Sequence, residues 1–318
     1  MEIGISLITP SAFKPLWWLS NPHLQTLWPV MFGANKPQGD NERLELDDGD
    51  FLDLRWFAND GPLVVVVHGL EGSIDSHYAG AMMLALQEHG FHGLFMHLRG
   101  CSGEPNRLDR SYHSGETGDL AAVVQHAARV TGKPVFAMIG YSLGANALLK
   151  WLGEVDGQAP LQRAVAVSVP FRLGDAARKL STGFSRLYQS HLLERLRRNF
   201  SRKFRQRTSP VQVDVDRLRD FYSFDDKVTA PLHGFDSADD YYRQSSSRQY
   251  LKNIRCETLI LHAQDDPFMY EESIPRNAEL SPQVTLELST HGGHVGFICG
   301  MWLPRRWLEP RIIRFLQS

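Results

Sequence analysis

Residues 135–152 read VFAMIGYSLGANALLKWL, and this stretch decides the fold. Its first five residues, Val135 to Ile139, form a short apolar run typical of a strand buried on both faces. The segment Gly140-Tyr141-Ser142-Leu143-Gly144 follows, and the pattern from Ser142 to Leu152 predicts a helix. A serine between two glycines at a strand-to-helix turn indicates a nucleophile elbow, a tight and strained turn that holds the hydroxyl out at the edge of a sheet.

Similar apolar runs recur along the chain and predict an α/β fold. The strand candidates are residues 43–47, 51–57, 63–67, 93–96, 135–139, 164–169, 258–262 and 284–288. The first two flank Asp48-Gly49-Asp50 and indicate an antiparallel hairpin. Helical patterns at 78–89, 118–130 and 142–152 separate several of the others. Strands that alternate with helices favour right-handed crossovers, so we expect a mostly parallel, eight-stranded sheet flanked by helices.

The alternation stops after Pro170 and resumes at Thr258. The residues between them are basic and amphipathic at first, then acidic and aromatic. We therefore expect residues 171–250 to form a helical cap insertion over the carboxyl edge of the sheet, where open α/β folds bind ligands. The predicted core then comprises residues 1–170 and 251–318, with an N-terminal extension at 1–42.

Bulk composition indicates a soluble globular protein. The chain has 318 residues, of which 42% are hydrophobic and 22% charged, with a formal net charge of −2. No apolar run is long enough to span a bilayer, and residues 1–15 lack the features of a secretory signal. The three cysteines are far apart and odd in number, which fits a reducing compartment. We expect a cytoplasmic protein.

A serine hydroxyl needs a base, and the base needs an orienting carboxylate. In the elbow-type fold these follow the serine in the order Asp or Glu, then His. Asp265-Asp266-Pro267 follows one strand candidate and His291-Gly292-Gly293-His294 follows the last. We prefer Asp266, further beyond the strand end, to Asp265, and His294, in a glycine-flanked loop, to His291. The histidine pair has no partner at the spacing of a zinc site, so we predict no metal.

The third requirement is a pair of donors for a developing oxyanion. His68-Gly69-Leu70-Glu71-Gly72 directly follows the third strand candidate, the position from which such folds supply one backbone N–H. The second comes from the residue after the nucleophile. We assign these donors to the amides of Leu70 and Leu143. His68 and Arg99 are expected to be structural.

Longer motifs now point to a family. They are residues 21–26 (NPHLQT), 68–73 (HGLEGS), 99–107 (RGCSGEPNR), 112–117 (YHSGET), 140–144 (GYSLG), 262–269 (HAQDDPFM) and 291–297 (HGGHVGF). Together they resemble the YheT-like subfamily of α/β hydrolases, which includes plant and animal relatives and yeast ester synthases. The resemblance covers nearly the whole chain. It implies the α/β-hydrolase fold, a triad of Ser142, Asp266 and His294, and carboxylesterase or acylglycerol-lipase-like activity.

The sequence therefore predicts a serine hydrolase that cleaves carboxylic esters through an acyl-enzyme, with no cofactor. An acyltransferase that uses the same triad is the first alternative, and a ligand-binding protein without catalysis is the second. The expected partner is a small-molecule ester or a lipid-like substrate. Acyl chain length, alcohol moiety and oligomeric state cannot be predicted from the sequence.

The predicted insertion carries a strong local charge. Residues 172–207 contain eleven Arg or Lys against two acidic residues, so the rest of the chain has a net charge of about −11. Such a segment is most often a solvated helical face. It could also attract an anionic membrane surface, with Leu187, Leu192, Leu193, Leu196, Phe200 and Phe204 as an apolar face, or steer acidic substrates. No nucleic-acid motif accompanies the charge, so we expect no nucleic-acid partner.

Overall fold

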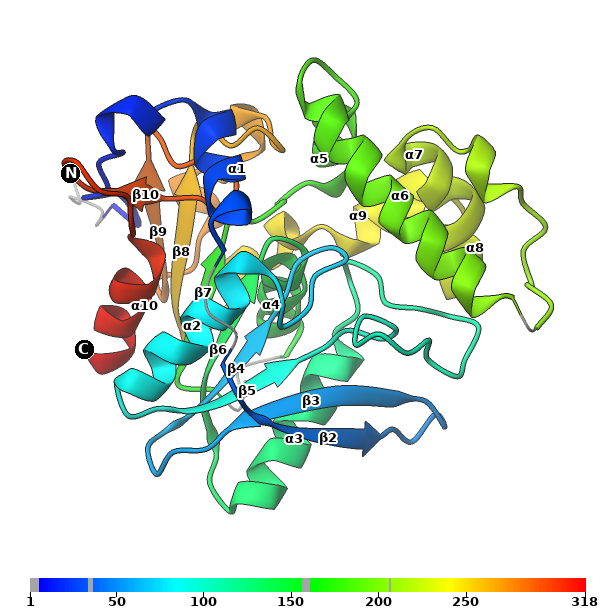
Figure 1. Cartoon of the computed structure of the whole chain (residues 1–318), viewed down its shortest axis with the longest axis horizontal. Coiled ribbons are helices and arrows are strands. Elements are labelled where there is room, and N and C mark those ends of the chain that lie inside the picture. Colours follow the sequence, from blue (N-terminus) through cyan, green and yellow to red (C-terminus); the bar gives the residue numbers. More distant parts are fainter. Residues whose placement is uncertain (1–5, 34–36, 156–160, 206) are drawn as a thin grey trace.

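Nine strands form one twisted sheet in this computed structural model, which describes residues 6–33, 37–155, 161–205 and 207–318 (Figure 1). The order across the sheet is β1-β9-β8-β7-β6-β4-β5-β3-β2. β3 is antiparallel to its neighbours β2 and β5, and all other pairs are parallel. The strands are β1 (Ile8–Pro10), β2 (Asp40–Glu45), β3 (Phe51–Phe57), β4 (Leu63–Val67), β5 (His92–Met96), β6 (Val135–Tyr141), β7 (Arg163–Val167), β8 (Glu257–Ala263) and β9 (Val284–Ser289).

Helices cover both faces of the sheet. Residues of α3 (Gly118–Thr131) and α4 (Leu143–Glu154) share one apolar cluster with Val65 and Val67 of β4. Residues of α2 (His77–Glu88) and α10 (Leu308–Gln317) share a second cluster with Val64 and Val66. Alternate side chains of a strand point to opposite faces, so the all-buried β4 contributes to both clusters.

Every strand and helix expected from the sequence is present, with ends that differ by three residues or fewer. One strand of the nine-stranded sheet was missed, as was a separate two-stranded hairpin of Ile298–Cys299 and Arg305–Arg306. β1 has only three residues and ends in a proline, and it pairs in parallel with β9 at the edge of the sheet. Too short for a periodic signal, it makes the sheet nine-stranded rather than eight-stranded, and an edge strand tolerates the proline. The predicted N-terminal extension therefore adds a strand to the sheet.

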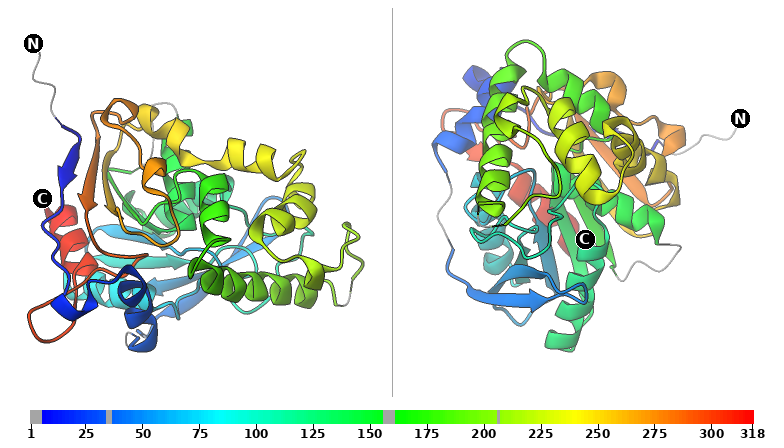
Figure 2. Two further views of the ribbon diagram at one scale, coloured as in Figure 1. Left: turned by 90° about the horizontal axis from the view of Figure 1, so that it is seen from above. Right: turned by 90° about the vertical axis from the view of Figure 1, so that its right-hand side faces the viewer.

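The residues between β7 and β8 are helical. They form α5 (Leu173–Leu180), α6 (Ser185–Lys203), the 3₁₀ helix η2 (Val215–Arg217), α7 (Phe221–Phe224), the π-helix η3 (Asp225–Thr229), α8 (Ala230–His233), α9 (Ala238–Ser245) and the 3₁₀ helix η4 (Ser247–Asn253). Figures 1 and 2 show α5 to α9 gathered as one group on the side of the molecule away from α10. We call residues 171–250 the inserted segment.

The long helix α6 of the inserted segment turns its apolar stripe inward. Leu193 is 1% exposed and packs with Val215, Leu218 and Phe224. The rest of the stripe is partly buried, and only Leu187 is largely exposed, at 60%. The apolar face of α6 thus stabilises the inserted segment, and the membrane contact expected for this basic segment stays a prediction. None of the helices in the described ranges has the length and hydropathy required to cross a bilayer.

Candidate active site

Ser142 lies at the turn between β6 and α4. Its backbone has φ 51° and ψ −115°, a conformation that residues other than glycine rarely adopt. The flanking glycines are required by close packing. A Cβ on Gly140 would lie 2.6 Å from the Gly144 carbonyl oxygen, and one on Gly144 would lie 2.4 Å from the His68 carbonyl oxygen. The elbow predicted from the sequence is thus present as a strained, tightly packed turn.

Ser142 begins a chain of hydrogen bonds that joins three strand ends. Its Oγ lies 2.9 Å from His294 Nε2, and His294 Nδ1 lies 2.8 Å from Asp266 Oδ2. Asp266 follows β8 and His294 follows β9, so the parallel strands deliver all three residues to one edge of the sheet. The ring of Phe268 stacks on the imidazole at 3.9 Å between centroids. The structure brings together the three residues preferred in the sequence, in the order that general-base activation of a serine requires.

The two alternatives, Asp265 and His291, bind each other instead. His291 Nδ1 lies 3.2 Å from Asp265 Oδ2, and neither side chain is hydrogen-bonded to Ser142. The other oxygen of Asp265 accepts the Gly293 N–H at 3.0 Å. Burial raises the pKa of Asp265 above its ordinary value. This second Asp-His pair braces the loop that presents His294.

Two residues with no role assigned from the sequence also hold this loop. Thr26 Oγ1, on α1 (Pro22–Met31), accepts the His294 N–H at 3.0 Å. Ser168 Oγ, just past β7, accepts the Val295 N–H at 3.0 Å. Ser168 and Val295 both have positive φ angles, 52° and 56°, which is unusual for a β-branched residue such as Val295. Thr26 belongs to the NPHLQT motif at 21–26, which was the only sequence signal for this contact.

The loop after β4 leaves one backbone amide free beside the serine. The Gly69 N–H donates to the Tyr78 hydroxyl at 2.9 Å, and the Glu71 N–H donates to the Tyr112 hydroxyl at 2.8 Å. Leu70 lies between them, and its amide has no acceptor within the described part of the chain. Leu70 also lines the cavity that contains Ser142. Its amide is thus available to a ligand.

The second predicted donor, the amide of Leu143, is the first of α4. N–H groups in the first turn of a helix have no partner within the helix, and the helix dipole favours negative charge there. The Leu70 loop is close to this helix end, because a Cβ on Gly69 would lie 3.0 Å from Cβ of Ser142. The loop that carries Leu70 and the helix end that carries Leu143 therefore meet at Ser142, and both residues line the same cavity as Ser142.

His68 and Arg99 are structural, as expected. The ring of His68 is fully buried, with Nδ1 at 2.6 Å from the Gly69 carbonyl oxygen and Nε2 accepting the Leu98 N–H. Burial lowers the pKa of His68 to about 3, so the ring is neutral. Arg99 is 3% exposed and forms a bidentate ion pair with Asp119.

Glu71 connects the loop after β4 to the inserted segment. It is 3% exposed and has a positive φ of 54°. Its carboxylate accepts hydrogen bonds from the Tyr112 hydroxyl, at 2.9 Å, and from the side-chain amide of Asn199 on α6. Burial raises the pKa of Glu71. No role was predicted for Glu71, because its contact with α6 depends on how the inserted segment folds back onto the core.

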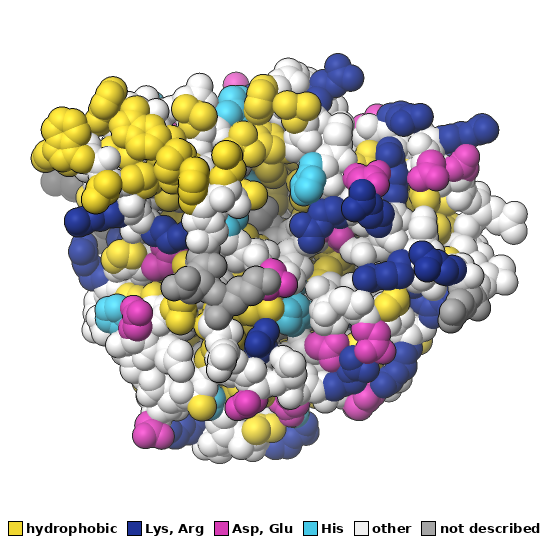
Figure 3. Space-filling view, viewed as in Figure 1, with side chains coloured by type: hydrophobic (Ala, Val, Ile, Leu, Met, Phe, Trp, Pro, Cys, Tyr) yellow, Lys and Arg dark blue, Asp and Glu magenta, His cyan; other side chains and the backbone are white. Residues whose placement is uncertain are grey.

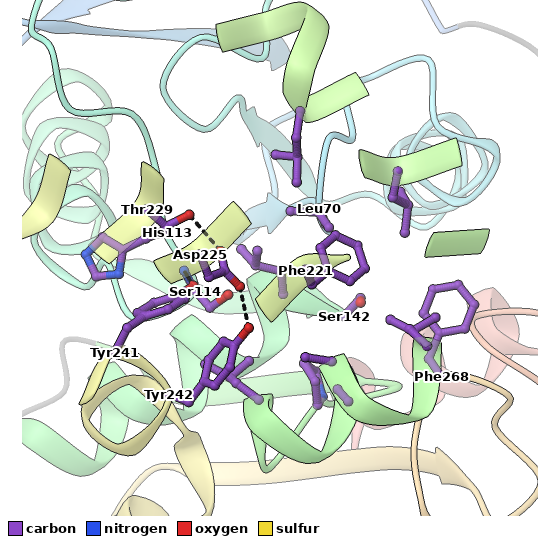
Figure 4. A pocket seen from close by; sticks show the side chains of 18 of the residues that line it. Leu70, His113, Ser114, Ser142, Phe221, Asp225, Thr229, Tyr241, Tyr242 and Phe268 are labelled. Carbon is purple, nitrogen blue, oxygen red and sulfur yellow. Dashed lines mark hydrogen bonds between the residues drawn. The ribbon is translucent and has the colours of Figure 1, made fainter. Parts of the chain in front are cut away.

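Ser142 opens onto a cavity between the sheet edge and the inserted segment (Figure 4). The cavity has a volume of about 790 Å³, its open mouth included. Most of its lining is apolar, with Leu173, Ala177, Leu180, Leu192, Leu196 and Phe221 contributed by the inserted segment. A concave, mostly apolar lining with a few polar groups is typical of a small-molecule site. In the described ranges, no group of three or more His, Cys, Asp or Glu side chains is arranged to hold a metal ion.

A model of the α/β hydrolase fold matches residues 62–300. The chain belongs to the α/β-hydrolase family. The sheet order, the strained elbow after β6 and the position of His294 after the last parallel strand all accord with that family.

The α/β-hydrolase relatives cover nearly all of the chain. The Escherichia coli protein named "Putative esterase YheT" is 45% identical over 96% of this chain and 93% of its own. The mouse protein named phospholipase ABHD3 is 29% identical over 98% of this chain and 79% of its own. The solved structure of the Pyrococcus furiosus esterase Pf2001 aligns with a TM-score of 0.59 and 17% identity, over 97% of this chain and 98% of that one. This last match supports the fold alone.

Proposed function

We propose that this chain is a carboxylic ester hydrolase that works through a covalent acyl-enzyme on Ser142. One observation carries the proposal. In the hydrogen-bond chain from Asp266 through His294 to Ser142, the Ser142 end lines an apolar cavity, as do Leu70 and Leu143, whose amides have no acceptor within the described part of the chain. Relatives named as an esterase and as a phospholipase support ester bonds as the target.

In the first step Ser142 Oγ attacks the ester carbonyl carbon while His294 Nε2 takes the hydroxyl proton. Asp266 accepts the Nδ1–H of His294, which fixes the tautomer and stabilises the imidazolium. The amides of Leu70 and Leu143 donate to the oxyanion, and each such donor contributes about 3 kcal/mol of transition-state stabilisation. The tetrahedral intermediate then collapses. The alkoxide leaves with the proton from His294, and the acyl group stays on Ser142.

Water completes the cycle. His294 takes a proton from a water molecule, whose oxygen attacks the acyl carbonyl carbon. Collapse of this second intermediate breaks the bond to Ser142 and returns the proton to its Oγ. The products are a carboxylic acid and an alcohol. The chemistry requires no cofactor.

The lining of the cavity favours a substrate with an apolar chain. Leucine and phenylalanine side chains of the inserted segment face the serine, and burying a methylene group against them contributes about 0.8 kcal/mol. We therefore propose medium-chain or lipid-like esters as substrates and treat the inserted segment as a cap over the sheet edge. The free cysteines Cys101, Cys256 and Cys299 fit a reducing compartment, and we propose the cytoplasm.

The proposal is tested by Ser142→Ala, assayed on p-nitrophenyl esters of graded chain length. We expect kcat to fall by about 10⁵-fold or more, because losing the nucleophile of such a triad costs that much in related mechanisms. Ser201→Ala, an exposed serine on α6, is the matched control and should keep full activity. Ester turnover unchanged in Ser142→Ala would refute the proposal, and formation of a new ester on adding an alcohol would indicate acyl transfer.

A further inference from the structure

The cavity above Ser142 has two chemically different ends. Figure 4 shows Ser142, Phe221 and Phe268 on one side of it. On the other side it shows a polar group of side chains. They are His113, Ser114, Asp225, Thr229, Tyr241 and Tyr242. An acyl chain alone does not require this polar end.

Asp225 is the charged member of that group. Its carboxylate accepts hydrogen bonds from Thr229 Oγ1 at 2.6 Å and from the Tyr242 hydroxyl at 2.7 Å. A carboxylate has about four acceptor positions, so about two remain. Among the described residues no Lys, Arg or His forms an ion pair with it, although it lies among other side chains of the inserted segment. Burial raises the pKa of Asp225 to about 6, so the group is still ionised at neutral pH.

The backbone also marks this position. Asp225 begins the π-helix η3, and a π-helical turn inside an α-helical region is rare and often found at functional sites. Asp225 is partly exposed although protein surrounds it, because it faces the cavity. Its remaining acceptor positions are therefore accessible to a ligand in the cavity.

We propose that the substrate chain in this cavity ends in a hydrogen-bond donor, a hydroxyl or an ammonium group, which Asp225 accepts. The inference rests on the proposed function for its geometry, with the ester carbonyl at Ser142 and the donor at the far end. A methyl group at the end of the chain would displace water from the carboxylate without forming a hydrogen bond in its place. A donor group would form that hydrogen bond. Asp225 is then a specificity residue, and its contacts with Thr229 and Tyr242 orient it.

Binding, rather than turnover, provides the test. The probes are N-methylamides of a medium-chain fatty acid with a methyl, hydroxyl or amino group at the far end, titrated calorimetrically into the wild-type protein. We expect the better of the two donor-ended probes to bind about tenfold more tightly than the methyl-ended one, the effect of one hydrogen bond to a charged group. Comparing the hydroxyl and amino probes identifies which donor is preferred.

Two variants locate the effect. Asp225→Asn should reduce the preference to about twofold or less, because the neutral amide loses the charged acceptor. Asp226→Asn, the next residue, carries the same change outside the cavity and should keep the preference. Equal binding of all probes by the wild type, or a preference unchanged in Asp225→Asn, would overturn the proposal. Hydrolysis is not measured, so this outcome is independent of whether Ser142 is the nucleophile.

A separate feature, an exposed apolar surface, supports a second inference. We call it the tryptophan corner. Its side chains are 46% to 74% exposed and come from the 3₁₀ helix η1 (Trp17–Leu19), from α1 and its C-terminal end, and from the turn between β10 (Ile298–Cys299) and β11 (Arg305–Arg306). They are Trp17, Leu24, Val30, Met31, Phe32, Met301, Trp302 and Leu303. Figure 3 shows apolar side chains gathered over this upper-left part of the molecule.

The parts of the corner are tied to one another. Leu16, Leu19 and Ile298 are buried together against Trp28, and the Leu16 N–H donates to the Ile298 carbonyl at 3.1 Å. The indole of Trp28 also contacts Phe32. These contacts hold the parts of the corner together. The corner is therefore a continuous apolar patch rather than a set of isolated surface side chains.

Charge favours one occupant of this surface. Residues 7–33 and 298–306 contain Lys14, Arg305 and Arg306 and no Asp or Glu, and Arg306 forms an ion pair with Glu309 of α10 at 3.6 Å. Exposed tryptophans near Lys14 and Arg305 match the interface of an anionic bilayer, where indole rings lie at the headgroup level. A second copy that docked through the same surface would add its own cations to the interface, without supplying an acidic partner from residues 7–33 or 298–306.

We infer that the tryptophan corner docks on an anionic lipid surface. The opposite side of α1 contacts the catalytic loop, since Thr26 accepts the His294 N–H and the Pro22 carbonyl lies against Gly293. Docking would place the active-site loop next to the bilayer. Lipid-like esters could then reach the cavity without crossing bulk water.

Co-sedimentation with vesicles tests this inference. We expect binding to vesicles that contain phosphatidylglycerol, weaker binding to pure phosphatidylcholine, and about tenfold weaker binding for Trp302→Ser and Trp17→Ser. Val130→Ser is the matched control, because Val130 is 55% exposed on α3, outside the corner, and should leave binding unchanged. Absence of vesicle binding, or a light-scattering mass of a dimer that Trp302→Ser converts to a monomer, would overturn the inference.

Discussion

The sheet edge and the inserted segment both border the cavity, but they contribute different chemistry. The edge supplies Ser142, Asp266 and His294 on loops held by buried hydrogen bonds and strained backbone. The inserted segment supplies mainly apolar side chains and, at the far end, Asp225. In the proposed mechanism, the reaction therefore depends on the core, whereas the choice of substrate depends on the inserted segment.

Buried polar contacts link the two regions. Asn146, on α4 four residues after Ser142, donates to the carbonyls of Ser114 and Ser245 and accepts the Ser247 N–H. Lys203, at the end of α6, donates to Asn106 Oδ1 and to backbone and hydroxyl oxygens of the loop 110–111. The inserted segment is therefore held at defined points, so substitutions in either region can be compared on a common framework.

Among the substitutions that compare the sheet edge with the inserted segment, Asp266→Asn at the sheet edge is expected to lower kcat most. An asparagine holds His294 in the wrong tautomer, and the equivalent change in a Ser-His-Asp protease lowers kcat by about 10⁴-fold. Steady-state kinetics on a short p-nitrophenyl ester measures the loss. A decrease smaller than about tenfold would show that Asp266 does not orient the base.

A smaller effect is expected from Asp265→Asn. This residue braces the histidine loop through the Gly293 N–H, and asparagine keeps one acceptor oxygen. Displacing the loop slightly weakens the contact between His294 and Ser142, and we expect kcat to fall by about tenfold with little change in KM. If Asp265→Asn lowered kcat much more than Asp266→Asn did, the assignment of the two carboxylates would have to be reversed.

The smallest effect concerns stability and belongs to the inserted segment. Burial raises the pKa of Asp225 from 3.8 to about 6, so between these values the folded chain binds a proton that the unfolded chain does not. This stabilisation is present at low pH and is lost as the pH rises through about 6. We expect the free energy of unfolding of the wild type, relative to Asp225→Asn, to fall by about 1 kcal/mol between about pH 5 and about pH 7. Denaturant titrations at the two pH values measure it, and a relative rise would contradict the assignment.

The core was predictable because its signals are local and periodic. The all-buried run of β4 and the GYSLG turn after β6 have one structural interpretation each, and chain order then selected Asp266 and His294. Choosing Asp266 over Asp265 also agreed with the observed contacts, since only the former reaches His294.

The remaining features depend on contacts between distant residues. β1 is too short to have a period, and the support that Thr26 gives His294 spans 268 positions of sequence. The sequence showed the apolar stripe of α6, but it did not show whether the stripe faces solvent or the rest of the inserted segment. Only the packing of Leu193 against η2 and η3 shows that it faces inward, while the exposed apolar surface lies on α1 and the turn after β10.

The central claim, that Ser142 is a nucleophile activated by His294, is tested most directly by covalent labelling. The protein is treated with a fluorophosphonate probe, and the modified peptide is identified by mass spectrometry. The account predicts a single phosphonylated residue, Ser142, with labelling lost in Ser142→Ala and strongly slowed in His294→Ala. Absence of labelling, or labelling of another serine that persists in Ser142→Ala, would contradict it.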